Sequence, residues 1–340
     1  MVNVSGYGLC VNDEPSYPMA WQSHDFFKAL KCYRKDIKPL NNIHPYSKCR
    51  IPSNGIEIYY EAFGNPENPT VLLIMGMDDQ CTLWVPYSYE PIVEAGYHVV
   101  RFDNRDCGLS YWIDDWDINN PYTLEDMAKD TLGVLDALNV GKAHLIGASM
   151  GGMISQRIAI SNPDRILTLT SIASSGFPFD PDPAMQPENS GESIKICDDL
   201  AVRYPDYQTS ATEIIEYRLE ALRALAGRRF PFDEKLHRRI QTKNIVERKG
   251  FNPLAQTHHL AAIIASGSRL DNLGQITVPT LVVHGTEDPL LAPAHAVKYA
   301  SLIPGARLVW MDGVGHELPA GIMELVHREI FDLFSMANTN

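Results

Sequence analysis

Short apolar runs alternate with helical segments along most of this chain, and this alternation strongly limits the folds that it can adopt. One helical segment begins at Thr123-Leu124-Glu125-Asp126, which resembles a capping box. An alternation of this kind predicts an α/β protein with a mostly parallel sheet and helices on both faces. The runs expected to form buried strands are residues 71–75, 97–102, 143–146, 166–172, 280–283 and 306–310.

The strand pattern is interrupted in the middle of the chain. A proline-punctuated loop begins at Gly176, and residues 193–266 have the pattern of several helices without strands between them. We therefore expect residues 176–267 to form a helical cap, or lid. This cap would be inserted into an α/β core made of residues 48–175 and 268–340.

The start of the chain is harder to assign. A β-hairpin is expected to open the core, because two strand-like runs flank Ser53-Asn54-Gly55, which is typical of a tight turn. Residues 1–47 form an N-terminal extension with one amphipathic stretch around residues 21–33. This extension could enlarge the lid, mediate self-association or have no catalytic role.

The segment Gly147-Ala148-Ser149-Met150-Gly151 lies where an expected strand should turn into a helix. It is a G-x-S-x-G sequence, and the flanking glycines allow a tight, strained turn that exposes the serine hydroxyl. An ordinary glycine-rich turn is the alternative. Nucleotide binding is less favoured, because no G-x-G-x-x-G follows a strand and Gly141-Lys142-Ala143 lacks the rest of a P-loop. Ser149 is therefore the candidate nucleophile.

A serine nucleophile needs a base to take its proton and an acid to orient that base. Asp288 follows the expected strand at 280–283, and His316 follows the expected strand at 306–310. Because the carboxyl ends of parallel strands meet at one edge of a sheet, both should lie on the same edge as Ser149. We predict a Ser149-Asp288-His316 triad.

Other interpretations of these positions remain open. Asp288 precedes a proline and could simply initiate a turn, while Glu287 and Asp312 are rival acids. His316 could be an ordinary loop histidine. The remaining histidines, including the pair His258-His259 and His284, are assigned by default to packing or solvent.

An ester-cleaving serine also needs donors for the oxyanion of its tetrahedral intermediate. We expect the backbone amides of Met150, which follows the serine, and of Met77, in the loop after the first parallel strand. Gly76, Trp84 and Met153 are candidates for the substrate pocket. Ordinary core packing explains Met153 at least as well.

The composition excludes several classes of partner. Against 29 Lys and Arg the chain has 42 Asp and Glu, a net charge of -13, which disfavours nucleic acid and anionic membranes. The six cysteines lack a C-x-x-C pair, and we expect neither a signal peptide nor a membrane-spanning run. We expect a cytoplasmic protein with a small-molecule substrate and without a cofactor or metal. It could form a homo-oligomer.

Over about residues 50–335 the chain resembles the α/β-hydrolase superfamily, specifically the esterase branch that includes aclacinomycin methylesterase. This resemblance implies a helical cap over the core, with Ser149 as nucleophile, Asp288 as acid and His316 as base. Their order in the chain is that of α/β-hydrolases. The blocks that carry the resemblance are residues 71–77 with Trp84, residues 101–106 with Gly108 and Ser110, residues 278–285 and residues 315–319.

One feature departs from this family pattern. Asp78-Asp79 occupies the loop after the first parallel strand, where relatives usually have small or neutral residues. An unpaired carboxylate there would oppose the negative charge of an oxyanion. These side chains should either point away or pair with a cation, for which Arg105 is a candidate.

The sequence thus predicts a serine hydrolase that cleaves a carboxylic ester of a small-to-medium, largely apolar substrate. The same triad could instead serve a lactonase or cyclase, a C–C bond hydrolase or an acyltransferase. A third possibility is a hydrolase-like ligand receptor with little turnover.

Overall fold

The computed structural model describes residues 43–177, 200 and 210–337 of the 340-residue chain. Eight strands form one sheet in the order β1-β2-β4-β3-β5-β6-β7-β8. The first three are joined by antiparallel pairs, and all later neighbours are parallel. The strands are β1 (Ser47–Ser53), β2 (Ile56–Phe63), β3 (Thr70–Ile74), β4 (His98–Phe102), β5 (Ala143–Ala148), β6 (Ile166–Ile172), β7 (Thr280–Gly285) and β8 (Arg307–Met311).

Helices cover both faces of this sheet because its central strands are apolar on both sides. In β3, Leu72 and Ile74 pack with α3 and α4, whereas Val71 and Leu73 pack with α2 and α10. This confirms the predicted fold class, a mostly parallel sheet between two helical layers. The layer helices are α2 (Pro86–Glu94), α3 (Leu124–Ala137), α4 (Met150–Ser161), α9 (Pro293–Leu302) and α10 (Met323–Ala337).

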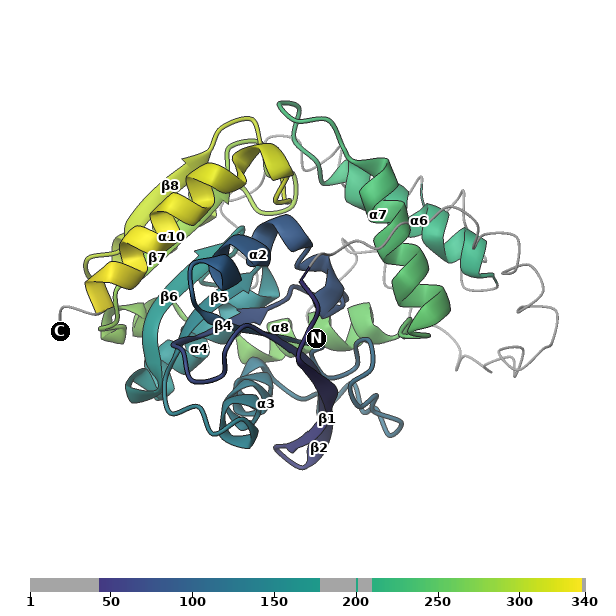
Figure 1. Ribbon diagram of the computed structural model, residues 1–340, viewed down its shortest axis with the longest axis horizontal. Helices are drawn as coiled ribbons and strands as arrows, with labels where there is room; N and C mark the ends of the chain where they lie inside the picture. The colour runs from purple at the N-terminus through teal and green to yellow at the C-terminus, as the bar shows by residue number, and fades with distance from the viewer. Residues whose placement is uncertain (1–42, 178–199, 201–209, 338–340) are drawn as a thin grey trace.

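The described part of the segment between β6 and β7 is helical, as expected. It contains α6 (Ala211–Ala224), α7 (Glu234–Thr242), the π-helix η7 (Lys243–Glu247) and α8 (Ala255–Ser266). Figure 1 shows α6 and α7 side by side at one end of the molecule, with α10 at the opposite end. The boundaries 176–267 of the cap stay a prediction.

Local structure follows the sequence signals closely. The hairpin turn has Asn54 and Gly55 at φ 48° and 81°, the conformation that an Asn-Gly turn favours. The capping box before α3 is present, with the Asp126 carboxylate accepting hydrogen bonds from the backbone N–H and the hydroxyl of Thr123. Helix α2 begins at Pro86, because proline is well suited to a first helical position.

Two further expectations from the sequence concern the N-terminal extension and membrane-spanning segments. The amphipathic stretch at 21–33 lies outside the described residues. Within residues 43–177 and 210–337, no helix combines the length and apolarity that crossing a membrane requires.

Candidate active site

Ser149 occupies a strained turn between β5 and α4. Its backbone has φ 52° and ψ -119°, a region that non-glycine residues rarely adopt and that costs about 1–3 kcal/mol. The turn is held by the end of β6: Ser149 N–H donates to the Ile172 carbonyl (2.8 Å), and the Ser174 hydroxyl donates to the Ser149 carbonyl (2.8 Å). The serine is thus fixed at the carboxyl edge of the sheet.

The glycines of the motif are required by close backbone contacts. A Cβ on Gly147 would lie 2.2 Å from the Gly151 carbonyl oxygen, and a Cβ on Gly151 would lie 2.0 Å from that of Ile74. A Cβ on Gly76 would lie 3.2 Å from the Cβ of Ser149. The loop after β3 therefore passes directly against the serine.

Asp288 and His316 meet after strands β7 and β8. The Nδ1 atom of His316 lies 2.7 Å from Oδ2 of Asp288, whose side chain is fully buried. The other carboxylate oxygen, Oδ1, accepts hydrogen bonds from the backbone N–H groups of Leu290 (2.9 Å) and Leu291 (2.8 Å). These backbone donors fix the carboxylate, and the carboxylate in turn fixes the imidazole.

The electrostatics of the pair determine which imidazole nitrogen carries the proton. Burial alone would raise the pKa of Asp288, but the charge and hydrogen bond of His316 lower it below its ordinary value. Burial would likewise lower the pKa of His316, yet Asp288 raises it. Because an ionised carboxylate only accepts hydrogen bonds, Nδ1 of His316 is the donor and the neutral ring keeps its lone pair on Nε2.

The rival acids are engaged elsewhere. Glu287 accepts hydrogen bonds from the backbone and side chain of Arg228 (2.9 Å and 3.0 Å), and Asp312 pairs with Arg229 (2.8 Å). Both arginines follow α6 in the helical segment. Of the three candidate acids, Asp288 is the one that contacts His316.

The loop after β3, residues 75–82, is called the oxyanion loop below because it contains Met77. Its acidic pair is bound by one cation: the guanidinium of Arg218 in α6 bonds the carboxylates of Asp78 and Asp79, and also the Asp78 carbonyl (3.1 Å). Of the two predicted alternatives for these carboxylates, pointing away or pairing with a cation, the structure shows the second. The amide of Met150 lies in the first turn of α4, where N–H groups lack intrahelical acceptors.

The prediction that Arg105 is the cation that pairs with Asp78 and Asp79 is wrong. Its guanidinium forms a bidentate pair with Asp130 in α3 (2.6 Å and 2.7 Å) and lies over the ring of Tyr122. The side chain therefore points toward α3 and is not available to the oxyanion loop.

The single positive charge of Arg218 cannot balance two carboxylates, and this affects the pKa of Asp79. Burial, helped by the neighbouring charge of Asp78, raises the pKa of Asp79 to about 6 against the opposing effects of Arg218 and His316. The Asp79 carboxylate in turn contributes to the raised pKa of His316. Two carboxylates thus act on this imidazole, and one of them titrates near neutral pH.

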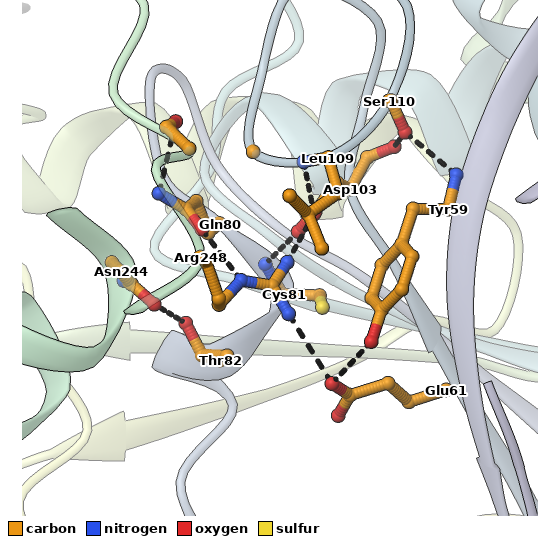
Figure 2. A network of polar contacts seen from close by, with 12 residues as sticks. Tyr59, Glu61, Gln80, Cys81, Thr82, Asp103, Leu109, Ser110, Asn244 and Arg248 are labelled. Atoms are coloured by element: carbon orange, nitrogen blue, oxygen red, sulfur yellow. Dashed lines mark hydrogen bonds and ion pairs between the residues drawn. The ribbon is translucent and has the colours of Figure 1, made fainter. Parts of the chain in front are cut away.

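A buried polar network ties the helical segment to the end of the oxyanion loop (Figure 2). Arg248, which follows η7, donates from Nε to the Gln80 side chain (2.8 Å) and from its Nη atoms to Glu61 (3.2 Å) and Asp103. Asp103 also accepts the backbone N–H of Cys81 (2.8 Å). This network connects β2, β4 and the oxyanion loop to the residues after η7.

Comparison with known proteins agrees with this geometry. Residues 69–319 match the family model described as the alpha/beta hydrolase fold. The chain belongs to the α/β-hydrolase family.

Relatives of this hydrolase include the rhodomycin D methylesterase of Streptomyces peucetius, which is 32% identical over 81% of this chain and 93% of that protein. A 2-hydroxy-6-oxononadienedioate/2-hydroxy-6-oxononatrienedioate hydrolase of Cupriavidus pinatubonensis is 29% identical over 73% of this chain and 80% of that protein. A solved structure, that of 2-hydroxy-6-oxo-6-phenylhexa-2,4-dienoate hydrolase from Rhodococcus, has the same fold. It aligns with a TM-score of 0.66 at 18% identity, covering 86% of this chain and 100% of that one. These relatives identify the chain as an enzyme of the hydrolase class.

The predicted pocket residues lie in different surroundings. Gly76 contacts Ser149, Trp84 is buried in the cluster under α2 and α10, and Met153 is buried in the cluster under α3 and α4. Their roles as pocket residues stay predictions. In the described part of the hydrolase, no group of three or more His, Cys, Asp or Glu side chains is arranged to hold a metal ion.

Sequence reasoning missed three residues that contact the oxyanion loop: Arg218, Arg248 and His259. His259 was assigned to packing or solvent, but it is buried and its Nδ1 accepts the backbone N–H of Asp78 (3.0 Å). The acidic pair was the one signal in the sequence that required a partner for this loop.

Proposed function

We propose that this hydrolase cleaves a carboxylic ester through an acyl-enzyme, with Ser149 as nucleophile, His316 as base and Asp288 as orienting acid. The proposal rests above all on the Asp288–His316 hydrogen bond. It leaves a lone pair on Nε2 of an imidazole whose loop follows β8, at the edge of the sheet where Ser149 occupies its strained turn.

In the proposed reaction, Nε2 of His316 takes the proton of Ser149 as the serine oxygen attacks the ester carbonyl. The amides of Met77 and Met150 stabilise the resulting oxyanion. Collapse of the intermediate expels the alcohol, which receives the proton from His316. A water molecule activated by the same imidazole then attacks the acyl-enzyme, releasing the acid and the free serine.

The charge of the site favours a neutral substrate over a strongly anionic one. Arg218, a cation that the helical segment brings to the site, is already saturated by Asp78 and Asp79. It is therefore a poor partner for a substrate carboxylate, and one negative charge of the acidic pair remains uncompensated. This excess negative charge suits the uncharged ester of a methylesterase better than the dicarboxylates that other relatives are named for. We therefore propose that the substrate is a largely apolar ester of small-to-medium size. Residues 176–267 are proposed to cover it as a cap.

Replacement of the nucleophile tests the proposal. Ser149→Ala should lower kcat for a 4-nitrophenyl ester by about 10⁶, leaving the catalysis that binding and the oxyanion hole supply. A fluorophosphonate should label the parent protein once at Ser149 and the variant not at all. Wild-type turnover by the variant would refute the assignment, and labelling without multiple turnovers on any ester would indicate a receptor.

A C–C bond hydrolase is the second candidate. A relative named as a hydrolase of 2-hydroxy-6-oxononadienedioate, a substrate whose name contains no ester, matches 73% of the chain at 29% identity. Product analysis separates the two. Methyl and aryl esters should be turned over faster than a vinylogous diketo acid, and the opposite order would favour carbon–carbon cleavage.

A further inference from the structure

A backbone N–H of the oxyanion loop is bound by an imidazole from α8. Asp78 has φ 61°, in the left-handed region that non-glycine residues seldom adopt, and its N–H donates to Nδ1 of His259 (3.0 Å). His259 is 0% exposed, so this contact is isolated from solvent. A buried imidazole nitrogen, 181 residues away in the chain, thus holds the loop in an unusual conformation.

The partners of His259 fix its tautomer. Nδ1 faces an N–H donor and must be the acceptor, whereas Nε2 lies 2.8 Å from the carbonyl oxygen of Arg105 and must be the donor. Burial lowers the pKa of His259. The neutral ring with its proton on Nε2 is therefore the form that both backbone groups require.

A second side chain holds the other end of the loop. The Asn104 amide donates from Nδ2 to the carbonyl oxygen of Met75 (3.0 Å). His259 and Asn104 thus fix the two peptide groups that flank the Gly76–Met77 peptide. That peptide carries the Met77 N–H, and Gly76 lies against Ser149. Because both flanking peptides are held, the position of the Gly76–Met77 peptide beside the serine is restricted.

The neighbouring histidine provides an internal comparison. His258 is also buried on α8, and its Nδ1 lies 2.9 Å from Oδ2 of Asp106, while its ring stacks on Trp116. These contacts attach α8 to the loop after β4 and make no hydrogen bond to the oxyanion loop. His258 and His259 therefore share helix, burial and residue type, and both contact the loop after β4, but of the two it is His259 that also bonds the oxyanion loop.

We propose that His259 is a positioning residue that aims the Met77 amide at the oxyanion by holding the Asp78 N–H. This inference rests on the proposed function, because it presupposes an oxyanion beside Ser149. Its effect is expected in the transition state: the loop must be correctly placed when charge develops on the carbonyl oxygen, whereas binding of the neutral ester depends on it much less.

Two replacements of His259 separate its two hydrogen bonds. In His259→Asn the amide oxygen can take the place of Nδ1 and keep the bond to Asp78. In His259→Gln the longer side chain can reach the Arg105 carbonyl in place of Nε2, but it offers no acceptor at the Nδ1 position. Relative to the parent enzyme, we expect kcat to fall about 10- to 100-fold in His259→Gln, with KM little changed. In His259→Asn, kcat should stay close to the parent value. His258→Gln is the matched control and should lower the melting temperature without a selective loss of kcat.

Affinity for a trifluoromethyl ketone, which forms a tetrahedral adduct with the serine, provides a second readout. It should weaken in His259→Gln in proportion to kcat. Circular dichroism checks that each variant is folded, and Asn104→Ala should reproduce the selective loss of kcat if His259→Gln does not fold. Equal losses in the Gln and Asn variants, or a loss of kcat in His258→Gln as large as in His259→Gln, would overturn the proposal. Wild-type turnover by Ser149→Ala would instead refute the proposed function itself.

Discussion

Two loops at the carboxyl edge of the sheet carry the proposed catalytic groups, and they are held in opposite ways. The loop after β7 fixes Asp288 with its own backbone, through the N–H groups of Leu290 and Leu291 two and three residues further on. The oxyanion loop is instead held by side chains from the helical segment, with partners such as Arg218 and Arg248 that lie 140 or more residues away.

This difference separates two parts of the catalytic apparatus. The Asp288 carboxylate is fixed by N–H groups of its own loop, whereas the backbone N–H of His316 donates to the carbonyl of Leu225 at the end of α6 (2.8 Å). The conformation of the oxyanion loop depends on the helices between β6 and β7 docking correctly on the core. Replacing the side chains of that segment that bond the oxyanion loop should therefore alter oxyanion stabilisation more than the Asp288–His316 pair.

The largest expected effect comes from the locally built loop. Asp288→Asn replaces the acceptor of the His316 Nδ1 proton by an amide that can donate to it, which favours the wrong tautomer. We expect kcat for a 4-nitrophenyl ester to fall by about 10⁴. Steady-state kinetics at a pH above the pKa of His316 would measure it.

Glu287→Gln is the matched control, because Glu287 precedes Asp288 but bonds Arg228. It should keep nearly all of kcat. A loss in this variant that equals that of Asp288→Asn would show that a different carboxylate orients the base.

The next largest effect is on stability, and it comes from the contacts of Arg248 that attach the helical segment to the oxyanion loop. Arg248→Met leaves the buried carboxylates of Glu61 and Asp103 without one of their cationic partners. Breaking a buried ion pair in this way costs about 3–5 kcal/mol, and we expect the lower end because both carboxylates keep other donors. The free energy of unfolding in urea provides the measurement.

Arg228→Met is the comparison on the opposite side. Its ion pair with Glu287 has the arginine side chain 85% exposed, so the loss should stay below about 1 kcal/mol. If the two variants were equally destabilised, the buried network of Figure 2 would not be the stronger attachment.

The same difference between the loops decides what the sequence could predict. The strands, the helices around Ser149 and the Asp288–His316 contact were predictable because each depends on the local pattern and on the rule that parallel strands end at one edge. The partners of Asp78 and Asp79 were not. A cation was one of the two outcomes that we expected, but it is Arg218 and not Arg105. The packing of α6 on the oxyanion loop brings distant residues together, and no spacing in the sequence indicates that contact.

The smallest expected effect comes from Asp79, the titratable carboxylate of the oxyanion loop. Its negative charge helps to raise the pKa of His316, and a base must be neutral to accept the serine proton. Asp79→Asn removes that charge, so the imidazole should lose its proton at a lower pH. The acid limb of the kcat/KM profile should then move to lower pH, by a few tenths to about one pH unit.

The parent enzyme should also show a broader acid limb than the variant. Protonation of Asp79, whose pKa is about 6, removes part of the negative charge that raises the pKa of His316, so the two titrations are coupled. Asp78→Asn is the control: it removes an equal charge from the same arginine, but Asp78 is not among the groups that raise the pKa of His316. Its acid limb should move less than that of Asp79→Asn. An equal shift in both variants would mean that the pKa of His316 depends on the total charge of Asp78, Asp79 and Arg218. The oxyanion loop would then act on His316 through that total charge and not through Asp79 alone.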